Sequence, residues 1–412
     1  MSSRPQPLRS LVALFTAGYT APYLLPTVVG RLATGLGLTP TQAGLAGSAL
    51  LLASACAGFA LAGRVDRIGP RTAARAGLLA MICGYGTAAA TGLVPLVLAG
   101  AVLGGFGSGT VTAVAASGIA ARHDPHRASA LGLLSVSATA GALYLTLPRL
   151  GTGHGLAFAA IATVAAAAWP GTRSLSSATR RQEPESPGDT PRRRLPHLLP
   201  GTILTATLVL WSLAQNALWG VSGRIGVTQA GLSEVTVGAV FAAALGAGLA
   251  GVTAARALGE RLGKALPIGA GTALIAACVA VSAGARDLPS FAAGEMAWNA
   301  MYPLVLSYVI ALSATLDPGG RWTILAGAAS SLGVACGPAV GTALSEALGY
   351  PAMGATLAAL LLATAVPLTA VARRTALRAP APQPLTELDL PHPKTHESQP
   401  AYTLAQPSTG GL

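Results

Sequence analysis

The stretch AGRVDRIGPR, residues 62–71, places Arg64, Asp66, Arg67 and Arg71 close together in a chain that is only 10% charged. On both sides lie long stretches of Ala, Leu and Gly that carry almost no charge. Gly69 within the motif supplies the backbone freedom that a tight turn needs. The contrast indicates a short charged turn that joins two apolar segments.

The apolar segments around this turn are long enough to span a membrane. The 412 residues are 52% hydrophobic, with a mean hydropathy of +0.58, whereas a soluble domain contains about 25% charged residues. A helix needs roughly 20 apolar residues to cross a bilayer core of about 30 Å. Strands of a membrane barrel would alternate apolar and polar residues, and these runs do not. The sequence therefore predicts an all-α membrane protein.

The apolar runs divide into six predicted spans on each side of a polar stretch. Their approximate limits are 10–30, 42–62, 74–94, 96–120, 129–148, 153–172, 199–220, 234–255, 266–284, 289–313, 323–345 and 351–371. The polar stretch and the end of the chain are rich in Ser, Pro and charge, a composition that cannot bury enough apolar surface to fold. We predict an N-terminal six-helix bundle (1–173), a cytoplasmic linker (174–197), a C-terminal six-helix bundle (198–373) and a disordered cytoplasmic tail (374–412).

The basic residues are distributed unequally over the two sides of these twelve spans. Only Arg31, Arg149, Arg224 and Arg286 fall on one side, and every other Lys and Arg falls on the side of the N-terminus. An excess of Lys and Arg marks the cytoplasmic side, so both termini are predicted to be cytoplasmic. The net charge of +12 is then a signal of topology, and nucleic-acid binding is not expected.

The charged turn after the second span recurs after the eighth. DRIG, residues 66–69, corresponds to ERLG, residues 260–263, because each gives an acid, Arg, an apolar residue and Gly. With this motif, its second copy and twelve spans, the chain resembles the major facilitator superfamily, whose loop between helices two and three carries such a signature. The resemblance covers about residues 10–373, and it implies two parallel six-helix halves that rock against each other.

In that family the charged turn locks the cytoplasmic ends of helices in one state and is released in the other. The resemblance assigns this gating role to Asp66, Arg67, Gly69, Arg71, Glu260, Arg261 and Gly263. A negative charge just before a helix N-terminus is favoured by the helix dipole, and the arginines can pair with it or with neighbouring helix ends. Fixing the orientation of the spans is a simpler role for the same charges.

Polar and aromatic residues gather in the first, seventh and tenth spans, which in this family help to line the central cavity. The candidate residues for binding solute or protons are Tyr19, Tyr23, Gln215, Asn216, Trp219, Glu295, Trp298, Asn299 and Tyr302. Pro22 and Pro26 interrupt the backbone hydrogen bonding of the first span, and Pro303 frees a carbonyl group in the tenth. We therefore expect the solute to bind where these three spans meet.

Glu295 is the only acid that we place well inside a span. Burial of its charge is costly, which makes it a functional candidate and suits a proton carrier. Asn299 and Tyr302 follow at i+4 and i+7, so the three residues share one helix face. The alternative is that Glu295 lies nearer the outer surface, because the span begins only around Pro289.

The expected activity is proton-driven export of a small organic solute. No Lys or Arg falls in the middle of a predicted span, whereas sites for phosphate or carboxylate usually supply Arg, and aromatic rings with one carboxylate suit a neutral or cationic amphiphile. Two features depart from the drug–proton antiporters of the family. Ala101 replaces an Arg often associated with proton coupling, and the fifth span lacks a Gly-Pro pair. An uptake symporter or an uncoupled facilitator of the same fold is the alternative.

Other functional classes are disfavoured. GERLGKAL, residues 259–266, lacks the spacing and the Ser or Thr of a Walker A loop. A membrane protease would need a His inside the membrane, and the only His within a predicted span, His154, lies at the very start of the sixth. The four Cys residues form no CxxC pair. We therefore expect no enzymatic activity, no metal and no cofactor. The expected setting is a monomer in the cell (inner) membrane, with the lipid bilayer, a small-molecule substrate and protons as its partners.

Overall fold

Helices account for every regular element in the computed structural model, which describes residues 7–62, 64–175, 195–259, 261–317 and 319–378. The N-terminal set consists of α1 (Leu8–Tyr23), α2 (Leu25–Leu36), α3 (Pro40–Ala62), α4 (Val65–Ile68), α5 (Pro70–Ala90), α6 (Val94–Ala120), α7 (Pro125–Leu150), α8 (His154–Ala168) and the short helix η1 (Trp169–Ser174). The C-terminal set consists of α9 (Leu198–Arg224), the π-helix η2 (Ile225–Gln229), α10 (Glu234–Leu258), α11 (Ala265–Ala283), α12 (Leu288–Leu316), α13 (Arg321–Leu348) and α14 (Tyr350–Arg378). Within these residues the predicted all-α fold class is confirmed.

Ten of the described helices are long and apolar enough to cross a membrane, and the pair α1 and α2, bent by 47° at its break, makes an eleventh. The third predicted span, α5, is not among them, because Arg71 and Arg75 lower the hydropathy of its first turns. The chain is a multi-pass membrane protein, as its composition predicted. By this criterion the described residues contain ten or eleven spans rather than twelve.

Several helices run past their predicted limits. The first span continues through α2 to Leu36, the seventh reaches Arg224, and the last reaches Arg378. Each extension passes or ends at an Arg, whereas the predicted spans stop before these arginines. Residues 176–194 of the predicted linker and 379–412 of the predicted tail lie outside the described part of the chain.

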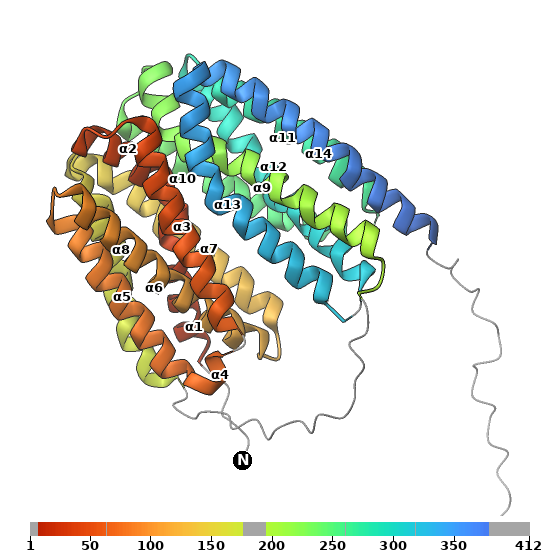
Figure 1. Ribbon diagram of the computed structural model, residues 1–412, viewed down its shortest axis with the longest axis horizontal. Coiled ribbons are helices and arrows are strands. Elements are labelled where there is room, and N and C mark those ends of the chain that lie inside the picture. Colours follow the sequence, from red (N-terminus) through yellow and green to blue (C-terminus); the bar gives the residue numbers. More distant parts are fainter. Residues whose placement is uncertain (1–6, 63, 176–194, 260, 318, 379–412) are drawn as a thin grey trace, which may run out of the picture.

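The two helix sets lie side by side in Figure 1, the N-terminal set in red to yellow and the C-terminal set in green to blue. Within the sets α6 packs on α3 and α5, and α9 packs on α13. The sets meet where α3 packs on α13, where α7 packs on α10 and where α2 packs on α9. These three contacts between the sets place α1 and α2 (the first span), α7 (the fifth span) and α9 around the centre of the molecule.

Gly333, Gly337 and Gly341 of α13 form a stripe of small residues that lets α13 approach α9 closely. A Cβ atom added at Gly333 would lie 2.3 Å from the carbonyl oxygen of Val209, and one added at Gly341 would lie 2.1 Å from that of Ala217. Both distances are below van der Waals contact. The four-residue spacing in the sequence indicates this packing correctly.

We predict that Gly341→Ala destabilises the protein because its methyl group would meet the backbone of α9. Overpacking of this kind lowers the free energy of unfolding by about 1–3 kcal/mol. Gly327 is the matched control, since it lies on the same helix, is exposed, and has no atom within 4 Å of an added Cβ. Melting of the detergent-solubilised variants measures the difference. Equal melting temperatures for Gly341→Ala and Gly327→Ala would contradict the close packing.

The end of the molecule remote from the N-terminus, here called the outer end, is where α2 meets α3 and α7 meets α8. Here the Thr41 hydroxyl donates to the Glu346 carboxylate at 2.6 Å, and the backbone N–H of Ala339 donates to Ser48 Oγ at 2.9 Å. Both hydrogen bonds connect α3 of one set to α13 of the other. The two sets are therefore joined at the outer end.

Candidate functional site

Glu295 is fully buried in α12. Its Oε1 accepts hydrogen bonds from Ser282 Oγ of α11 at 2.6 Å and from Ser222 Oγ of α9 at 2.8 Å. Its Oε2 is buried and has no hydrogen-bond partner among the described residues. At 1.5 Å per residue, Glu295 lies about 10 Å along the axis from Leu288, where α12 begins. The carboxyl group is therefore enclosed by three helices of the C-terminal set, halfway between the outer end of α12 and its middle.

The Ser222 hydroxyl group has two acceptors within reach. Besides Glu295 Oε1, the backbone carbonyl oxygen of Leu218 lies 3.0 Å from Ser222 Oγ. A serine hydroxyl carries one proton and accepts through its lone pairs. Ser222 can therefore donate to only one of the two oxygens. Both contacts are hydrogen bonds if Ser222 donates to the Leu218 carbonyl oxygen and a protonated Glu295 carboxyl group donates to Ser222 Oγ.

An aromatic cluster formed by Trp211, Trp219, Phe241, Trp298 and Tyr302 lies along α9, α10 and α12. The Trp211 and Tyr302 rings stack with centroids 5.5 Å apart, and Trp298 lies 6.3 Å from Tyr302. Trp219 continues the cluster, 5.6 Å from Trp298 and 5.2 Å from Phe241. The structure thus brings three of the predicted site residues, Trp219, Trp298 and Tyr302, into one largely buried aromatic cluster.

The predicted amide side chains differ in how they are held. Gln215 is fully buried and accepts a hydrogen bond from Trp298 Nε1 at 3.0 Å, while its own Nε2 donates to the carbonyl oxygen of Trp211 at 3.3 Å. Asn216 and Asn299 each donate at 2.9 Å to a backbone carbonyl group one turn earlier in their own helix. Gln215 therefore fixes the cluster, and the two asparagines keep their side-chain oxygens for other contacts.

The first span breaks at Leu24, as its prolines predicted, and the break faces the C-terminal set. Pro26 has no N–H, so it cannot bond the carbonyl group of Pro22 four residues earlier. Trp219 Nε1 of α9 donates to that carbonyl oxygen at 3.2 Å. Next to it, the Tyr144 hydroxyl of α7 donates to the carbonyl oxygen of residue 23. Aromatic side chains from both sets thus satisfy the exposed backbone of this break.

Tyr19 and Tyr23 of α1 are half-buried and lie outside the aromatic cluster defined above. The Tyr19 ring lies 4.5 Å from the Phe15 ring. The sequence did not indicate Ser222 and Ser282, which the structure places against Glu295. Ser222 could have been found, because it follows Gln215 at i+7 and so lies on the same face of α9.

We predict that Trp219→Phe weakens the closure of the outer end. Phe retains an aromatic ring but loses the N–H that bonds Pro22, a contact worth about 1 kcal/mol, or about fivefold in the population of an open state. The matched control is Trp322→Phe, which removes a 2.7 Å hydrogen bond to the Pro196 carbonyl oxygen within the C-terminal set. Labelling of a Thr27→Cys variant by a membrane-impermeant thiol reagent, with the four native Cys residues replaced, reports access from the outer end. Labelling that is equally fast with and without Trp219→Phe would contradict the prediction.

The two charged turns contain glycines that the backbone requires. Gly69 has a φ angle of 91° and Gly263 has one of 61°, a region that side-chain-bearing residues rarely adopt. Asp66 belongs to the short helix α4, but its side chain lies outside the part of the chain that the structure describes, and so does the whole of Glu260. The turn geometry of both motifs is therefore visible, and the contacts of their acids are not.

The arginines of the first turn lie at the end of a neighbouring helix. Arg71 Nε donates to the Thr172 carbonyl oxygen at 3.2 Å, and Arg75 Nε donates to Thr172 Oγ1 at 3.1 Å. Both bonds join α5 to η1, where cations are favoured by the dipole of the preceding helix. Arg67 and Arg261 are exposed. In this state the described contacts of Arg71 and Arg75 stay within the N-terminal set.

Arg31 is the charged residue that the sequence analysis misplaced. We predicted it in a loop beyond the first span, but it lies in α2 and is only 4% exposed. Its Nη2 donates to the carbonyl oxygens of Leu147 at 3.1 Å and Gly151 at 2.8 Å, and lies 3.4 Å from the Glu234 carboxylate. The apolar run that continues past Arg31 to Leu36 was the available signal.

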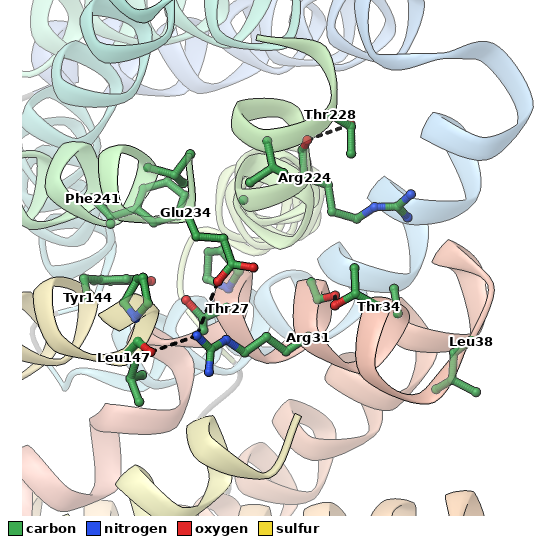
Figure 2. Close-up of a pocket in the computed structure, with 18 residues that line it drawn as sticks. Thr27, Arg31, Thr34, Leu38, Tyr144, Leu147, Arg224, Thr228, Glu234 and Phe241 are labelled. Carbon is green, nitrogen blue, oxygen red and sulfur yellow. Dashed lines mark hydrogen bonds and ion pairs between the residues drawn. The ribbon is translucent and has the colours of Figure 1, made fainter. Parts of the chain in front are cut away.

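Arg31 and Glu234 line a cavity of about 230 Å³ at the outer end. Figure 2 shows the two side chains meeting between α2 and α10, with Tyr144, Leu147 and Phe241 beside them. Among the described residues no three His, Cys, Asp or Glu side chains are close enough to hold a metal ion. The cavity is therefore lined by the buried Arg31 and its partly exposed partner Glu234, by a second arginine, Arg224, by threonines and by apolar side chains.

Comparison with known proteins places the chain in a family of transporters. Residues 10–316 match the family model described as Major Facilitator Superfamily. No curated protein matches the sequence. The matched region is well over half of the chain, and it extends from the first predicted span through α12.

Several solved structures share the fold. The human organic anion transporter MFSD10 (TETRAN) superposes with a TM-score of 0.60 at 18% identity, covering 88% of this chain and 99% of that one. A POT family transporter in complex with 5-aminolevulinic acid gives 0.70 at 12% identity, covering 89% and 96%. A mutant of the peptide transporter POT gives 0.71 at 14% identity, covering 89% and 94%. At these identities the likeness concerns the fold alone.

Proposed function

Because the chain belongs to the Major Facilitator Superfamily and is thus a non-enzymatic secondary transporter of a small molecule, we propose that Glu295 carries the proton that drives its transport. The supporting observation is a fully buried carboxyl group with one oxygen, Oε2, that has no donor among the described residues. An ionised carboxylate in such surroundings is strongly disfavoured. The state described here therefore suits the neutral form of Glu295.

The neighbouring hydroxyl groups support the same assignment. If Oε1 of Glu295 bears the proton, it donates to Ser222 Oγ, and the Ser222 hydroxyl proton is free for the Leu218 carbonyl oxygen. Ser282 then donates to Oε1. Each of the three protons has one acceptor, which fits the capacity of hydroxyl and carboxyl groups. Release of the proton would leave Oε2 charged and unpartnered, so it requires a rearrangement that admits water or another donor.

We propose alternating access with the outer end closed in the state described. Hydrogen bonds of Arg31, Thr41, Ser48 and Trp219 connect the two helix sets at or near the outer end, and at the opposite end Arg256 of α10 donates to the carbonyl oxygen of His126 at 3.5 Å. With both termini cytoplasmic, as the charge distribution predicts, this state faces the cytoplasm. The two sets would then rock as six-helix bundles joined by the linker 174–197.

The solute of this cycle is proposed to be neutral or cationic and amphiphilic, and to be exported from the cell. The cluster of Trp211, Trp298 and Tyr302 supports this proposal because cations are attracted to aromatic faces. Trp211 and Trp298 are buried in the state described, so the solute would reach their rings after a rearrangement. Asn216 and Asn299, next to the cluster, have side-chain oxygens able to accept hydrogen bonds. We further propose that the transporter works as a monomer in the cell membrane.

Uncoupled facilitation or uptake is the second candidate. Ala101 of α6 is buried at a position where related antiporters often carry Arg, so one element associated with proton coupling is missing. The experiment that separates these functions uses vesicles that contain the protein and a trapped pH indicator. A solute found by its thermal stabilisation of the folded protein is then applied as a gradient. Coupled transport moves protons with the solute gradient, whereas solute flux without a pH change would contradict the proton-driven function.

A further inference from the structure

We propose that the outer cavity is a binding site for a small carboxylate with an apolar body, which pairs with Arg31 in place of Glu234. This site is separate from Glu295 and shares only Phe241 with the aromatic cluster, and the inference does not depend on the solute proposed above. Three observations carry it: the state of the Arg31 guanidinium group, the weak hold of Glu234 on it, and the walls of the cavity.

Arg31 is a buried cation that lacks a full set of partners. Its Nη2 donates to the carbonyl oxygens of Leu147 and Gly151, and Nη1 lies 3.4 Å from that of Gly153. Carbonyl oxygens satisfy donors but do not neutralise a charge. Its Nε has no hydrogen-bond partner among the described residues. A guanidinium group offers a planar fork that fits both oxygens of a carboxylate, and here only part of that fork is used.

Glu234 is a poor fit to this fork. It approaches through one oxygen at 3.4 Å, whereas charge-assisted hydrogen bonds of this kind are usually about 2.7–2.9 Å long. Its side chain is 37% exposed, whereas that of Arg31 is 4% exposed. Glu234 can therefore turn into water with little loss of solvation, and Arg31 cannot. A ligand carboxylate would replace a weak partner of a buried charge.

The walls of the cavity select for an apolar body next to the carboxylate. Figure 2 shows Tyr144, Leu147 and Phe241 on one side of the ion pair. Thr34 and Thr228, both exposed, lie at its rim. A volume of about 230 Å³ is below that of sites for drug-sized ligands, which begin at about 300 Å³. The site therefore fits a compact carboxylate, such as one carried by a single ring.

Occupation of the site would also act on the outer end. Arg31 belongs to the N-terminal set and Glu234 to the C-terminal set, so a ligand that replaces Glu234 removes an ion pair between the sets. A ligand shifts a conformational equilibrium by its difference in affinity for the two states. The carboxylate would therefore favour opening of the outer end, whether or not it is itself carried across.

Calorimetric titration of the purified full-length protein with phenylacetate tests this site, with phenylacetamide as the uncharged match. We expect saturable binding of phenylacetate. The affinity for phenylacetamide should be lower by about tenfold or more, because hydrogen bonds to charged groups contribute about 1.5–3 kcal/mol. Arg31→Gln should remove the preference for the carboxylate. Glu234→Gln should bind phenylacetate several-fold more tightly, about threefold or more, because the competing carboxylate is gone.

Arg149→Gln is the control for the loss of one positive charge at the outer end, since Arg149 is exposed and does not line the cavity. It should bind phenylacetate like the wild type. Equal binding of acid and amide, no binding to the wild type, or unchanged or weaker binding to Glu234→Gln would each overturn the proposal. If Arg31→Gln does not fold, the Glu234→Gln titration decides alone. Failure here leaves proton flux in vesicles untouched, so it is distinguishable from failure of the proposed function.

Discussion

Glu295→Gln should abolish solute accumulation driven by a pH gradient while it preserves solute binding and exchange. Gln has the shape of the protonated carboxyl group, and with its side-chain oxygen in the place of Oε1 it can accept hydrogen bonds from Ser222 and Ser282, so the contacts between α9, α11 and α12 survive. It cannot release a proton. A carrier fixed in the neutral form still changes between its two states, but nothing links that change to the pH gradient.

The measurement is uptake into reconstituted vesicles with and without an imposed pH gradient, using a solute identified by thermal stabilisation. Asp287→Asn is the matched control, because Asp287 caps the N-terminus of the same helix and Asn caps helices equally well. Asp287 is exposed. Two hydrogen bonds from Ser290 lower the pKa of its carboxyl group, so the group stays ionised. Gradient-driven accumulation that persists in Glu295→Gln would remove Glu295 from the coupling mechanism. Loss of solute binding would make it a solute contact instead.

Asp66→Asn should reduce transport by about tenfold or more, which corresponds to a shift of about 1.4 kcal/mol between two conformational states. The turn that holds Asp66 is tightly defined. Gly69 follows with a φ angle of 91°, and Arg71 and Arg75 beyond it already bond the end of η1. A negative charge shortly before the start of α5 favours that helix end and would offset part of the positive charge of the turn. Asn keeps the volume and removes the charge.

Transport normalised to the amount of protein in the membrane measures this effect. The control is Asp124→Asn, in another turn on the same side, where Asp124 accepts a hydrogen bond from the Arg127 N–H at 2.9 Å as the cap of α7. Full activity of Asp66→Asn would reduce the charged turn to a signal for orientation. A drop in membrane expression with normal activity per molecule would lead to the same conclusion.

Local sequence patterns predicted the features that local physics controls. Pro22 and Pro26 remove backbone donors wherever the chain lies, so the break at Leu24 could be predicted. The spacing of Gly333 and Gly341 likewise defines one helix face. The order of apolar runs was enough for the fold class. The family resemblance, from the charged turn and its second copy, is confirmed by the match over residues 10–316.

Contacts between distant helices could not be predicted in this way. Ser282 meets Glu295 only because α11 packs on α12, and no spacing within either helix indicates that contact. Arg31 was placed in a loop because a charge normally ends an apolar span. The structure buries it where carbonyl groups at the end of α7 accept hydrogen bonds from its guanidinium group and the Glu234 carboxylate of α10 lies 3.4 Å away.

The protonation state of Glu295 is the central claim, and infrared difference spectroscopy of the purified protein measures it without any solute. A protonated carboxyl group buried in the protein has a carbonyl stretching band that ionised carboxylates lack. Stepping the pH should produce a difference band in this region for the wild type and for Asp287→Asn, and no such band for Glu295→Gln. A band of equal size in Glu295→Gln, or no band in the wild type at any pH at which the protein stays folded, would contradict Glu295 as the proton carrier.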